Sequence, residues 1–279
     1  MATNSTTHAS IIAPALVGDL IIRPLINQSI AGQALTETQI ATAAINFPVV
    51  TADPAAGWVA EGAEIAVTDS TVTQVTVTPS KLAGLSIISR ELADDSSPAA
   101  AQLIGDGLVR DMSRKLDTAL FAASTTNGPS GLAGVSGVST VSAGAGYTNA
   151  DPFTAAEFAS ATANGVISAW VTSPTVAQAL SNLKETTTSA RPLLQPDPTT
   201  PSVRQILGRP LLVSPYCPTT NNVVWGVDAR FAHLVIRAGA TVEADRSVYF
   251  TSDRVALKAT MRVGFGWTNP AALVKITTT

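Results

Sequence analysis

The side chains able to do acid–base, nucleophilic or metal chemistry are few in this sequence. Its two histidines are His8 and His233, and its single cysteine is Cys217. A histidine-based metal site needs several ligands, and one histidine in a polar leading segment and another in an apolar segment do not converge by spacing. A serine hydrolase could use only His233 as its base, and no Gly-x-Ser-x-Gly turn presents a serine. We therefore expect no metal site, and a hydrolase based on His233 is the enzymatic alternative left open.

Two acidic pairs have the residue types of a general acid and a general base. The first is Asp94-Asp95, which stands just before Pro98 at the predicted start of a helix, where such side chains cap free amides. The second is Glu61 with Glu64, in a loop-like segment where both carboxylates are expected to be solvated. Capping and solvation are the simpler interpretations. No motif supports an enzyme, and we expect no catalytic residue and no cofactor.

The composition of the 279 residues indicates a surface that other subunits cover. Charged residues make up only 13% and hydrophobic residues 46%, whereas ordinary soluble proteins carry roughly 25% charged residues. A β-rich domain with neutral polar faces would also fit. The net charge of −3 is not that of a protein that grips nucleic acid tightly. Because Cys217 is alone, no intrachain disulfide is expected.

No membrane span and no secretion signal are expected. The apolar stretch Ile11–Ile26 is interrupted by Asp19, Arg23 and two prolines, and no run reaches the ~18 apolar residues of a membrane-spanning helix. The first basic residue is Arg23, so the positive start of a signal peptide is missing. We expect the chain to be made and folded in a cytoplasm.

A long two-stranded arm is predicted in the first third of the chain. Residues 39–50 and 67–78 are rich in Val, Ile and Thr, and Val75 and Val77 alternate with threonines at the period of two that indicates a strand. Between them, residues 51–66 have the Gly, Pro and acidic content of a loop. An isolated two-stranded arm is marginal in water, so this arm should lie on another surface. The polar start of the chain cannot fold alone either.

The clearest helix is predicted to begin at Pro98 and to end before Asn127-Gly128. Apolar side chains recur at helical spacing along one side: Ile104, Leu108, Met112, Leu116 and Leu120. Charged side chains are placed on the other side: Asp106, Arg110, Arg114 and Asp117. This pattern predicts one long helix with its apolar stripe packed on the core.

Shorter elements follow the long helix. Residues 128–147 are rich in Gly, Ser and Val but lack the lysine of a phosphate-binding loop, and we interpret them as a mobile surface loop. The segment 191–201 holds four prolines and predicts an exposed loop. Helices are predicted over 154–166 and 175–184. Short strands are predicted over 169–171, 211–214, 223–227, 234–237, 242–244 and 272–276, and a helix or a strand over 255–265.

Several stretches of the chain resemble segments of one known protein family, both in their residues and in their order. GWVAEGAEI (57–65), VTPSKLAGLSIISRELADDS (77–96) and NGPSGLAGV (127–135) are followed by residues 211–218, 223–239 and 248–276. In this order they resemble the extended loop, the return into a long spine helix, the turn after it, the axial domain and the closing segment of one family. That family is the major capsid proteins of tailed bacteriophages, with the Hong Kong phage fold.

The resemblance implies a fold class and a domain division. It implies an α+β fold in which a peripheral domain, carrying a spine helix at about residues 98–123, is combined with an α/β axial domain. The implied division is an N-terminal arm at 1–36, an extended β-hairpin loop at 37–88, a peripheral domain at 89–139 and 241–279, and an axial domain at 140–240.

The same resemblance implies the function and the partners. The chain would be a structural subunit that self-assembles into the pentamers and hexamers of an icosahedral head around double-stranded DNA. Assembly would take place in the cytoplasm of a host bacterium, and DNA would be contacted weakly and without sequence specificity. A scaffolding protein, a portal and a decoration protein are the other partners implied. The alternative is the shell of an encapsulin-type nanocompartment, which resembles the same fold and packages enzymes.

The sequence departs from the family in two respects. Some members join their subunits by an isopeptide bond between a lysine of the extended loop and an asparagine near the C-terminus. Here the corresponding C-terminal positions are Asp253 and Thr260, and residues 52–69 contain no lysine, so we expect no autocatalytic cross-link. There is also no long N-terminal scaffolding domain, which implies a separate scaffolding protein or removal of a preceding segment.

The residues expected to contact a neighbouring subunit lie at the tip of the predicted arm. They are Trp58, Glu61, Glu64 and Ile65. A tryptophan on an exposed loop tip usually has a partner surface, because large aromatic side chains dominate the energetics of interfaces. The alternative is that Trp58 folds back on its own domain.

Overall fold

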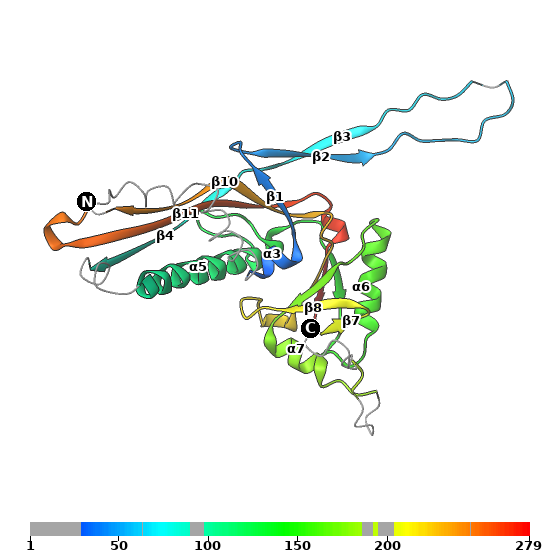
Figure 1. Cartoon of the computed structure of the whole chain (residues 1–279). Coiled ribbons are helices and arrows are strands. Elements are labelled where there is room, and N and C mark those ends of the chain that lie inside the picture. Colours follow the sequence, from blue (N-terminus) through cyan, green and yellow to red (C-terminus); the bar gives the residue numbers. More distant parts are fainter. Residues whose placement is uncertain (1–28, 63, 90–97, 186–191, 195–203, 246) are drawn as a thin grey trace.

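The computed structural model describes residues 29–62, 64–89, 98–185, 192–194, 204–245 and 247–279. It shows two sheets that meet at one end, a long helix beneath the first sheet, and a two-stranded arm that projects away from both (Figure 1). Most of the predicted N-terminal arm, the pair Asp94-Asp95 and most of the proline-rich segment 191–201 lie outside the described residues.

The first sheet has four strands in the order β1–β10–β11–β4. Their bounds are β1 (Thr36–Ile40), β10 (Ala232–Asp245), β11 (Arg254–Trp267) and β4 (Ser80–Ser89). β1 is parallel to β10, and the other neighbours are antiparallel. Two of the predicted short strands, 234–237 and 242–244, are therefore parts of the single strand β10, whose register shifts between Arg237 and Thr241. The open choice at 255–265 is settled as a strand.

The predicted long helix is confirmed as α5 (Pro98–Phe121). Met112, Leu116 and Leu120 of its stripe are buried, and they pack against inward side chains of the first sheet such as Met261 and Val263. Asp117, predicted on the charged side, is instead 4% exposed. Its carboxylate faces the short helix α3 (Ile30–Ala34) and not water.

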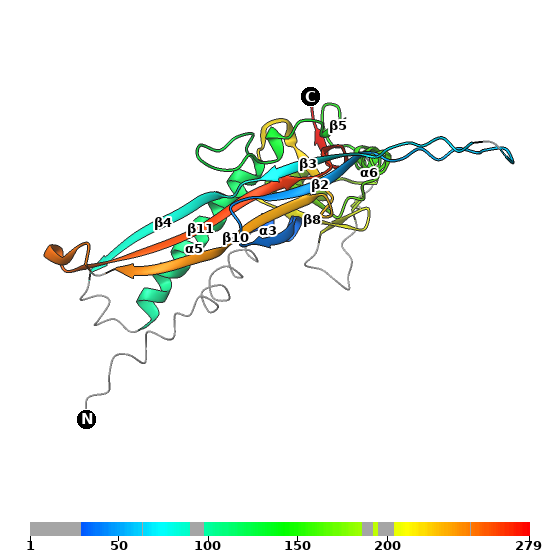
Figure 2. The ribbon, with the colours of Figure 1, turned by 90° about the horizontal axis from the view of Figure 1, so that it is seen from above.

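The predicted arm is confirmed as an antiparallel hairpin of β2 (Ile45–Ala52) and β3 (Thr71–Val77). The hairpin lies over the face of the first sheet opposite α5, and its limbs continue beyond the strands as a long loop (Figures 1 and 2). The paired part of the hairpin consists of the segments that are rich in β-branched residues and alternate between apolar and polar side chains. The Gly- and Pro-containing residues 53–70 form the unpaired part, which carries no strand where it is described.

The second sheet has six strands in the order β5–β12–β9–β6–β8–β7. Their bounds are β5 (Ser139–Ser142), β12 (Val274–Thr277), β9 (Val224–Val227), β6 (Ala169–Thr172), β8 (Arg209–Val213) and β7 (Gln205–Ile206). The two predicted helices of this region are α6 (Asp151–Thr162) and α7 (Pro174–Ser181). Phe153 of α6 meets the edge of Trp170 in β6 at 5.1 Å between ring centroids, in the middle of its core.

Two features of the segment order differ from expectation. The stretch 128–147 is not a mobile loop, because Leu132 is 1% exposed and β5 pairs with β12. The last strand is confirmed but belongs to the second sheet, so the range 241–279 is divided between β11 in one sheet and β12 in the other. One continuous apolar core joins α5 and β11 to Trp225 of β9 and to Leu273, which directly precedes β12; the six-stranded sheet with α6 and α7 is termed the second unit. No helix within the described residues is long and apolar enough to cross a membrane.

Candidate assembly surfaces

The base of the arm is packed onto its own copy. Phe47 of β2 stacks on His233 of β10 with ring centroids 4.5 Å apart and an interplanar angle of 16°. Val77 of β3 joins Ile40 and Val235 in a small apolar cluster there. The hairpin is therefore packed on the first sheet at its base, whereas its limbs extend beyond the edge of that sheet (Figure 2).

Two glycines of β11 allow this close approach. A Cβ atom at Gly264 would lie 3.0 Å from Val77 and 3.3 Å from the backbone of Pro79. A Cβ atom at Gly266 would lie 2.9 Å from Val77. These distances are shorter than nearly all Cβ contacts in proteins, so glycine at both positions lets the hairpin lie closer to β11 than a larger residue would without a shift of Val77.

The tip of the arm is exposed throughout its described residues. Trp58, Glu61, Glu64 and Ile65 are all exposed, and Trp58 is fully so. The two limbs touch through a hydrogen bond of 3.1 Å that the Thr68 hydroxyl donates to the Ala55 carbonyl. The structure therefore places the four predicted interface residues together on one tip, and Trp58 does not fold back on its own copy.

The surroundings of His233 are those of a packing residue. Its Nδ1 atom is buried and makes no hydrogen bond within the described part of the chain, so no carboxylate orients the ring as a general base requires. Burial lowers its pKa below the ordinary value of 6.5. Cys217 is buried, and burial raises the pKa of its thiol to about 12, which leaves it unreactive.

A buried carboxylate that sequence reasoning missed fixes the start of the described chain to the long helix. Asp117 accepts hydrogen bonds from the Ser29 hydroxyl at 2.6 Å, and from the amides of Ile30 at 3.3 Å and Ala31 at 3.2 Å. Burial raises the pKa of Asp117 against the opposing effect of these bonds. The sequence does not indicate this role of Asp117, because the residues that donate to its carboxylate are more than eighty positions away in the chain.

A second buried carboxylate, Asp228, links the segment that follows α6 to the turn that follows β9. Asp228 accepts hydrogen bonds from the Val166 amide at 2.7 Å and from the Arg230 guanidinium at 2.7 and 3.1 Å. Burial alone would raise the pKa of Asp228, but these bonds outweigh it and hold the pKa below its ordinary value. Both carboxylates are therefore structural, since each has its acceptor sites occupied by the chain itself.

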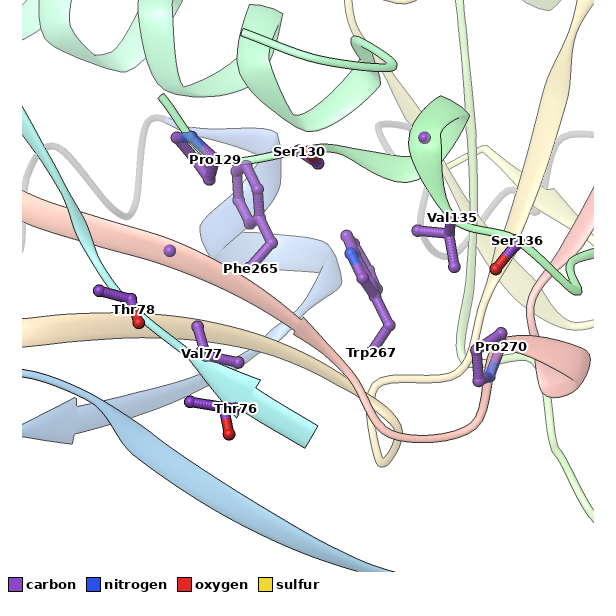
Figure 3. A pocket seen from close by; sticks show the side chains of 12 residues that line it. Thr76, Val77, Thr78, Pro129, Ser130, Val135, Ser136, Phe265, Trp267 and Pro270 are labelled. Atoms are coloured by element: carbon purple, nitrogen blue, oxygen red, sulfur yellow. The ribbon is translucent and has the colours of Figure 1, made fainter. Parts of the chain in front are cut away.

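A hollow of about 350 Å³ lies beside the base of the arm. Figure 3 shows Trp267 and Phe265 at its wall, with Val77 on the side of the arm. None of its lining residues is titratable, so it has no general acid or base. No group of three or more metal-ligating side chains occurs among the described residues. The most prominent exposed feature of the described residues is the arm tip with Trp58 and Ile65.

A subunit with a firm core and an exposed arm defines a class of protein that forms assemblies, and the comparisons agree. The sequence model of the phage capsid family matches residues 9–278. The chain therefore belongs to the phage capsid family, and it is a structural protein of the virion capsid that associates with further copies of itself. No curated protein matches it in sequence. The family match gives no support to a nanocompartment shell or a hydrolase.

Solved structures show the same fold. The capsid chain of an empty GTA particle has 18% sequence identity, a TM-score of 0.75, and 88% of each chain covered. A chain from Microbacterium phage Oxtober96 has 18% identity and a TM-score of 0.74, with 90% of this chain and 91% of that one covered. A chain from Mycobacterium phage Adephagia has 15% identity and a TM-score of 0.73, with 100% and 99% covered. The expected Hong Kong phage fold is confirmed.

Proposed function

We propose that this chain is the major shell subunit that assembles into pentamers and hexamers of an icosahedral tailed-phage head around double-stranded DNA. The observation that carries the proposal is the arm. Its base is fixed by Phe47, Val77 and two glycines, while its tip presents Trp58 and Ile65 to solvent. A large aromatic side chain on a projecting tip gains stability only by burial on a partner.

The domain division is part of this proposal. The four-stranded sheet with α5 corresponds to the peripheral domain, and the six-stranded sheet with α6 and α7 corresponds to the axial domain that surrounds the symmetry axes. On this division β12 is counted with the axial sheet, because it pairs with β5 and β9. Closed rings then follow from one heterologous contact repeated around an axis.

The remaining partners and the setting are proposed on family grounds. They are a separate scaffolding protein, a portal, a decoration protein, and packaged DNA that is contacted weakly and without sequence specificity. Assembly takes place in the cytoplasm of the host bacterium. We propose no catalytic activity, since the only histidine in the described residues is packed against Phe47.

Negative-stain microscopy of the purified chain, with and without a co-expressed scaffolding protein, tests the proposal. Closed shells with five- and six-fold clusters are the expected result. A chain that stays monomeric under both conditions, at concentrations where family members assemble, would contradict it.

A further inference from the structure

The hollow beside the base of the arm lies where one strand of the first sheet continues past its neighbour. β4 begins at Ser80, which pairs with Val263, whereas β11 continues to Trp267. Beyond Val263 the edge of β11 on the β4 side has no partner strand within the described residues. Gly264, Phe265 and Trp267 line the hollow from this edge, so the hollow is open to an added extended chain.

Flat apolar rings form the walls of the hollow. The rings of Phe265 and Trp267 stack with their centroids 6.0 Å apart and an interplanar angle of 29°, and Pro129 and Pro270 also line the hollow. Figure 3 shows the two aromatic rings directed from β11 towards the loop that carries Pro129 and Val135. Aromatic-lined grooves of this kind bind proline-rich peptides in other proteins.

The polar side chains of the hollow include several neutral hydrogen-bond donors. The hydroxyls of Thr78, Ser130 and Ser136 and the indole N–H of Trp267 have no hydrogen-bond partner in the part of the chain that the structure describes. None of the lining residues is charged, and none has an amide side chain. The hollow therefore suits a neutral ligand that supplies carbonyl acceptors and few N–H groups of its own.

A proline-rich peptide has this chemistry. Proline has no backbone N–H, and in the polyproline II conformation the carbonyl groups make no internal hydrogen bonds. The conformation is set before binding, so little chain entropy is lost on ordering. An anionic ligand, by contrast, would find no cationic partner among the lining residues.

The chain itself contains a segment of this kind, residues 195–203, which we term the proline-rich segment. It holds three prolines, the last two at P-x-x-P spacing in Pro198-Thr199-Thr200-Pro201, and Asp197 is its only charged residue. The segment lies outside the described residues, but both of its flanks are held in the second unit. Leu194 packs against the core there, and Ile206 is buried.

The segment can reach a hollow only on another copy. A loop of nine residues fixed at both ends extends at most about 16 Å from its anchors, half of its extended length. Figure 1 shows α7, which precedes the segment, at the opposite end of the second unit from the arm. α6, with 12 residues and a length of about 18 Å, runs along the unit between these ends.

We propose that the hollow lined by Trp267 and Phe265 binds the proline-rich segment of a second copy. This inference rests on the proposed shell function, and it gives the shell a contact between the second unit of one subunit and the first sheet of another. The prolines pack on the two aromatic rings, and the unpaired donors of the hollow bind the carbonyl groups between them.

Peptide binding to the unassembled full chain tests the recognition. A fluorescein-labelled peptide of residues 192–203 is titrated with the subunit, and its anisotropy reports binding. Trp267→Ala in the subunit, or alanine at the three prolines of the peptide, should each weaken binding at least about tenfold. Trp58→Ala removes an exposed tryptophan elsewhere and should bind as wild type.

A second variant keeps the test valid if Trp267→Ala disturbs the fold. Thr78→Val with Ser136→Ala removes two donors at exposed positions, so the core is untouched. This pair of substitutions should weaken peptide binding about threefold or more, because the carbonyl groups of the peptide then lose two partners. Unchanged affinity in this variant would contradict the role given to the hydroxyls.

Disulfide trapping tests whether the contact joins different copies. Chains with Ser136→Cys are assembled together with chains that carry Thr200→Cys, and the particles are oxidised. A disulfide-linked dimer on a non-reducing gel is the expected result, to which the buried Cys217 does not contribute. Thr148→Cys in place of Ser136→Cys, also at an exposed position, is the matched control and should give no dimer.

The outcomes separate the inference from the proposed function. If wild type forms no shells, the function is contradicted, and the peptide titration still decides the recognition. If shells form while the peptide does not bind and no dimer appears, the inference is wrong and the function stands. Peptide binding without a dimer in mixed particles would also overturn the inference, since the hollow would then receive another proline-rich protein or its own chain.

Discussion

Single residues decide how the start of the described chain and the base of the arm are held. Asp117 lies on the long helix, yet its carboxylate closes the amino end of α3 and so fixes the segment that leads into β1. His233 supports the arm through its ring and does no chemistry. Aspartate and histidine are common catalytic residues, but the contacts of Asp117 and His233 are those of structural residues.

Removing the Asp117 carboxylate is expected to loosen α3 from the long helix. In Asp117→Ala the Ser29 hydroxyl and the Ile30 amide lose their acceptor, and the Ala31 amide keeps only the Ser29 hydroxyl oxygen. This costs about 1–3 kcal/mol of unfolding free energy. Urea unfolding of the unassembled chain measures this loss. Arg114→Ala, an exposed site on the same helix, is the control, and an equal loss in both variants would contradict the role of Asp117.

The pH dependence of Asp117 has a definite sign. Burial raises its folded-state pKa above 3.8, so the folded chain binds the proton more tightly than the unfolded chain. Its contribution to stability is therefore full below pH 3.8 and falls as the pH rises through the raised pKa. Relative to Asp117→Asn, wild type should lose stability on going from pH 4 to neutral pH. A constant difference between the two over this range would be inconsistent with a raised pKa.

The opposite sign is expected for His233. Burial lowers its pKa below 6.5, so the unfolded chain binds the proton more tightly, and stability falls as the pH drops from 6.5 through the lowered value. His233→Asn removes this titration. Thermal unfolding between pH 5 and 7 should show a steeper acid loss for wild type than for the variant, and identical slopes would disprove the assignment.

At the scale of secondary-structure elements, the strands of the arm explain why its base is packed and its tip is exposed. β2 and β3 pair over eight and seven residues and lie on β10 and β11 at their base, whereas residues 53–70 have no sheet beneath them. The close approach depends on glycines at alternate positions of β11. The same alternation places Arg262 at the next outward position.

A side chain at either glycine should detach the arm without unfolding the sheet. Gly264→Val introduces a Cβ atom 3.0 Å from Val77 and 3.3 Å from the backbone of Pro79, with two methyl groups beyond it, so we expect the valine side chain to displace the base of the hairpin. The expected result is a folded subunit, with unchanged far-ultraviolet circular dichroism, that forms at least about tenfold fewer particles because the tip is no longer aimed at its neighbour. Gly146→Val, where no atom lies within 4 Å, is the matched control; normal assembly of Gly264→Val would refute the argument.

The sequence allowed most elements to be predicted, and the failures have physical causes. The stripe Met112, Leu116, Leu120 and the alternation at Val75 and Val77 carry strong local periodicity, so α5 and β3 were predictable. β5 was not, because four residues of Ser, Thr and Val next to glycines have no periodicity of their own and become a strand only by pairing with β12. The sequence predicted two short strands separated by Ala238-Gly239-Ala240. In the structure β10 continues through these residues, and its pairing with β11 shifts in register there.

Of the candidate assembly surfaces, only the arm tip was predictable from the sequence. Trp58, Glu61, Glu64 and Ile65 are neighbours in the chain, so their common place on the tip followed from one loop. By contrast, the neighbouring cationic residues Lys81, Arg262 and Arg237 lie on three strands up to 181 positions apart, and only the register of β4, β11 and β10 brings them together. No local pattern signals such a surface.

At the scale of the whole molecule, the subunit combines two sheets that share one apolar core with an arm that projects from them. The low fraction of charged residues suits the proposal that other subunits cover much of its surface. We therefore expect the shell to be held together by repeated, non-covalent contacts.

No covalent joining of subunits is expected. Residues 52–69 contain no lysine, and the positions that correspond to the family's C-terminal asparagine are Asp253 and Thr260. Boiled particles should therefore run on a denaturing gel as a single band at the position of one chain. A ladder of covalent multimers would contradict this prediction, and a family member that does cross-link serves as the positive control.

The most direct test of the account is sedimentation velocity of wild type, Trp58→Asp and Trp58→Phe under assembly conditions. If the arm tip finds its place only on another copy, wild type and Trp58→Phe will sediment as closed shells, and Trp58→Asp will remain as small, folded species. Shells of Trp58→Asp at the yield of wild type would contradict the claim that the tip is buried between subunits.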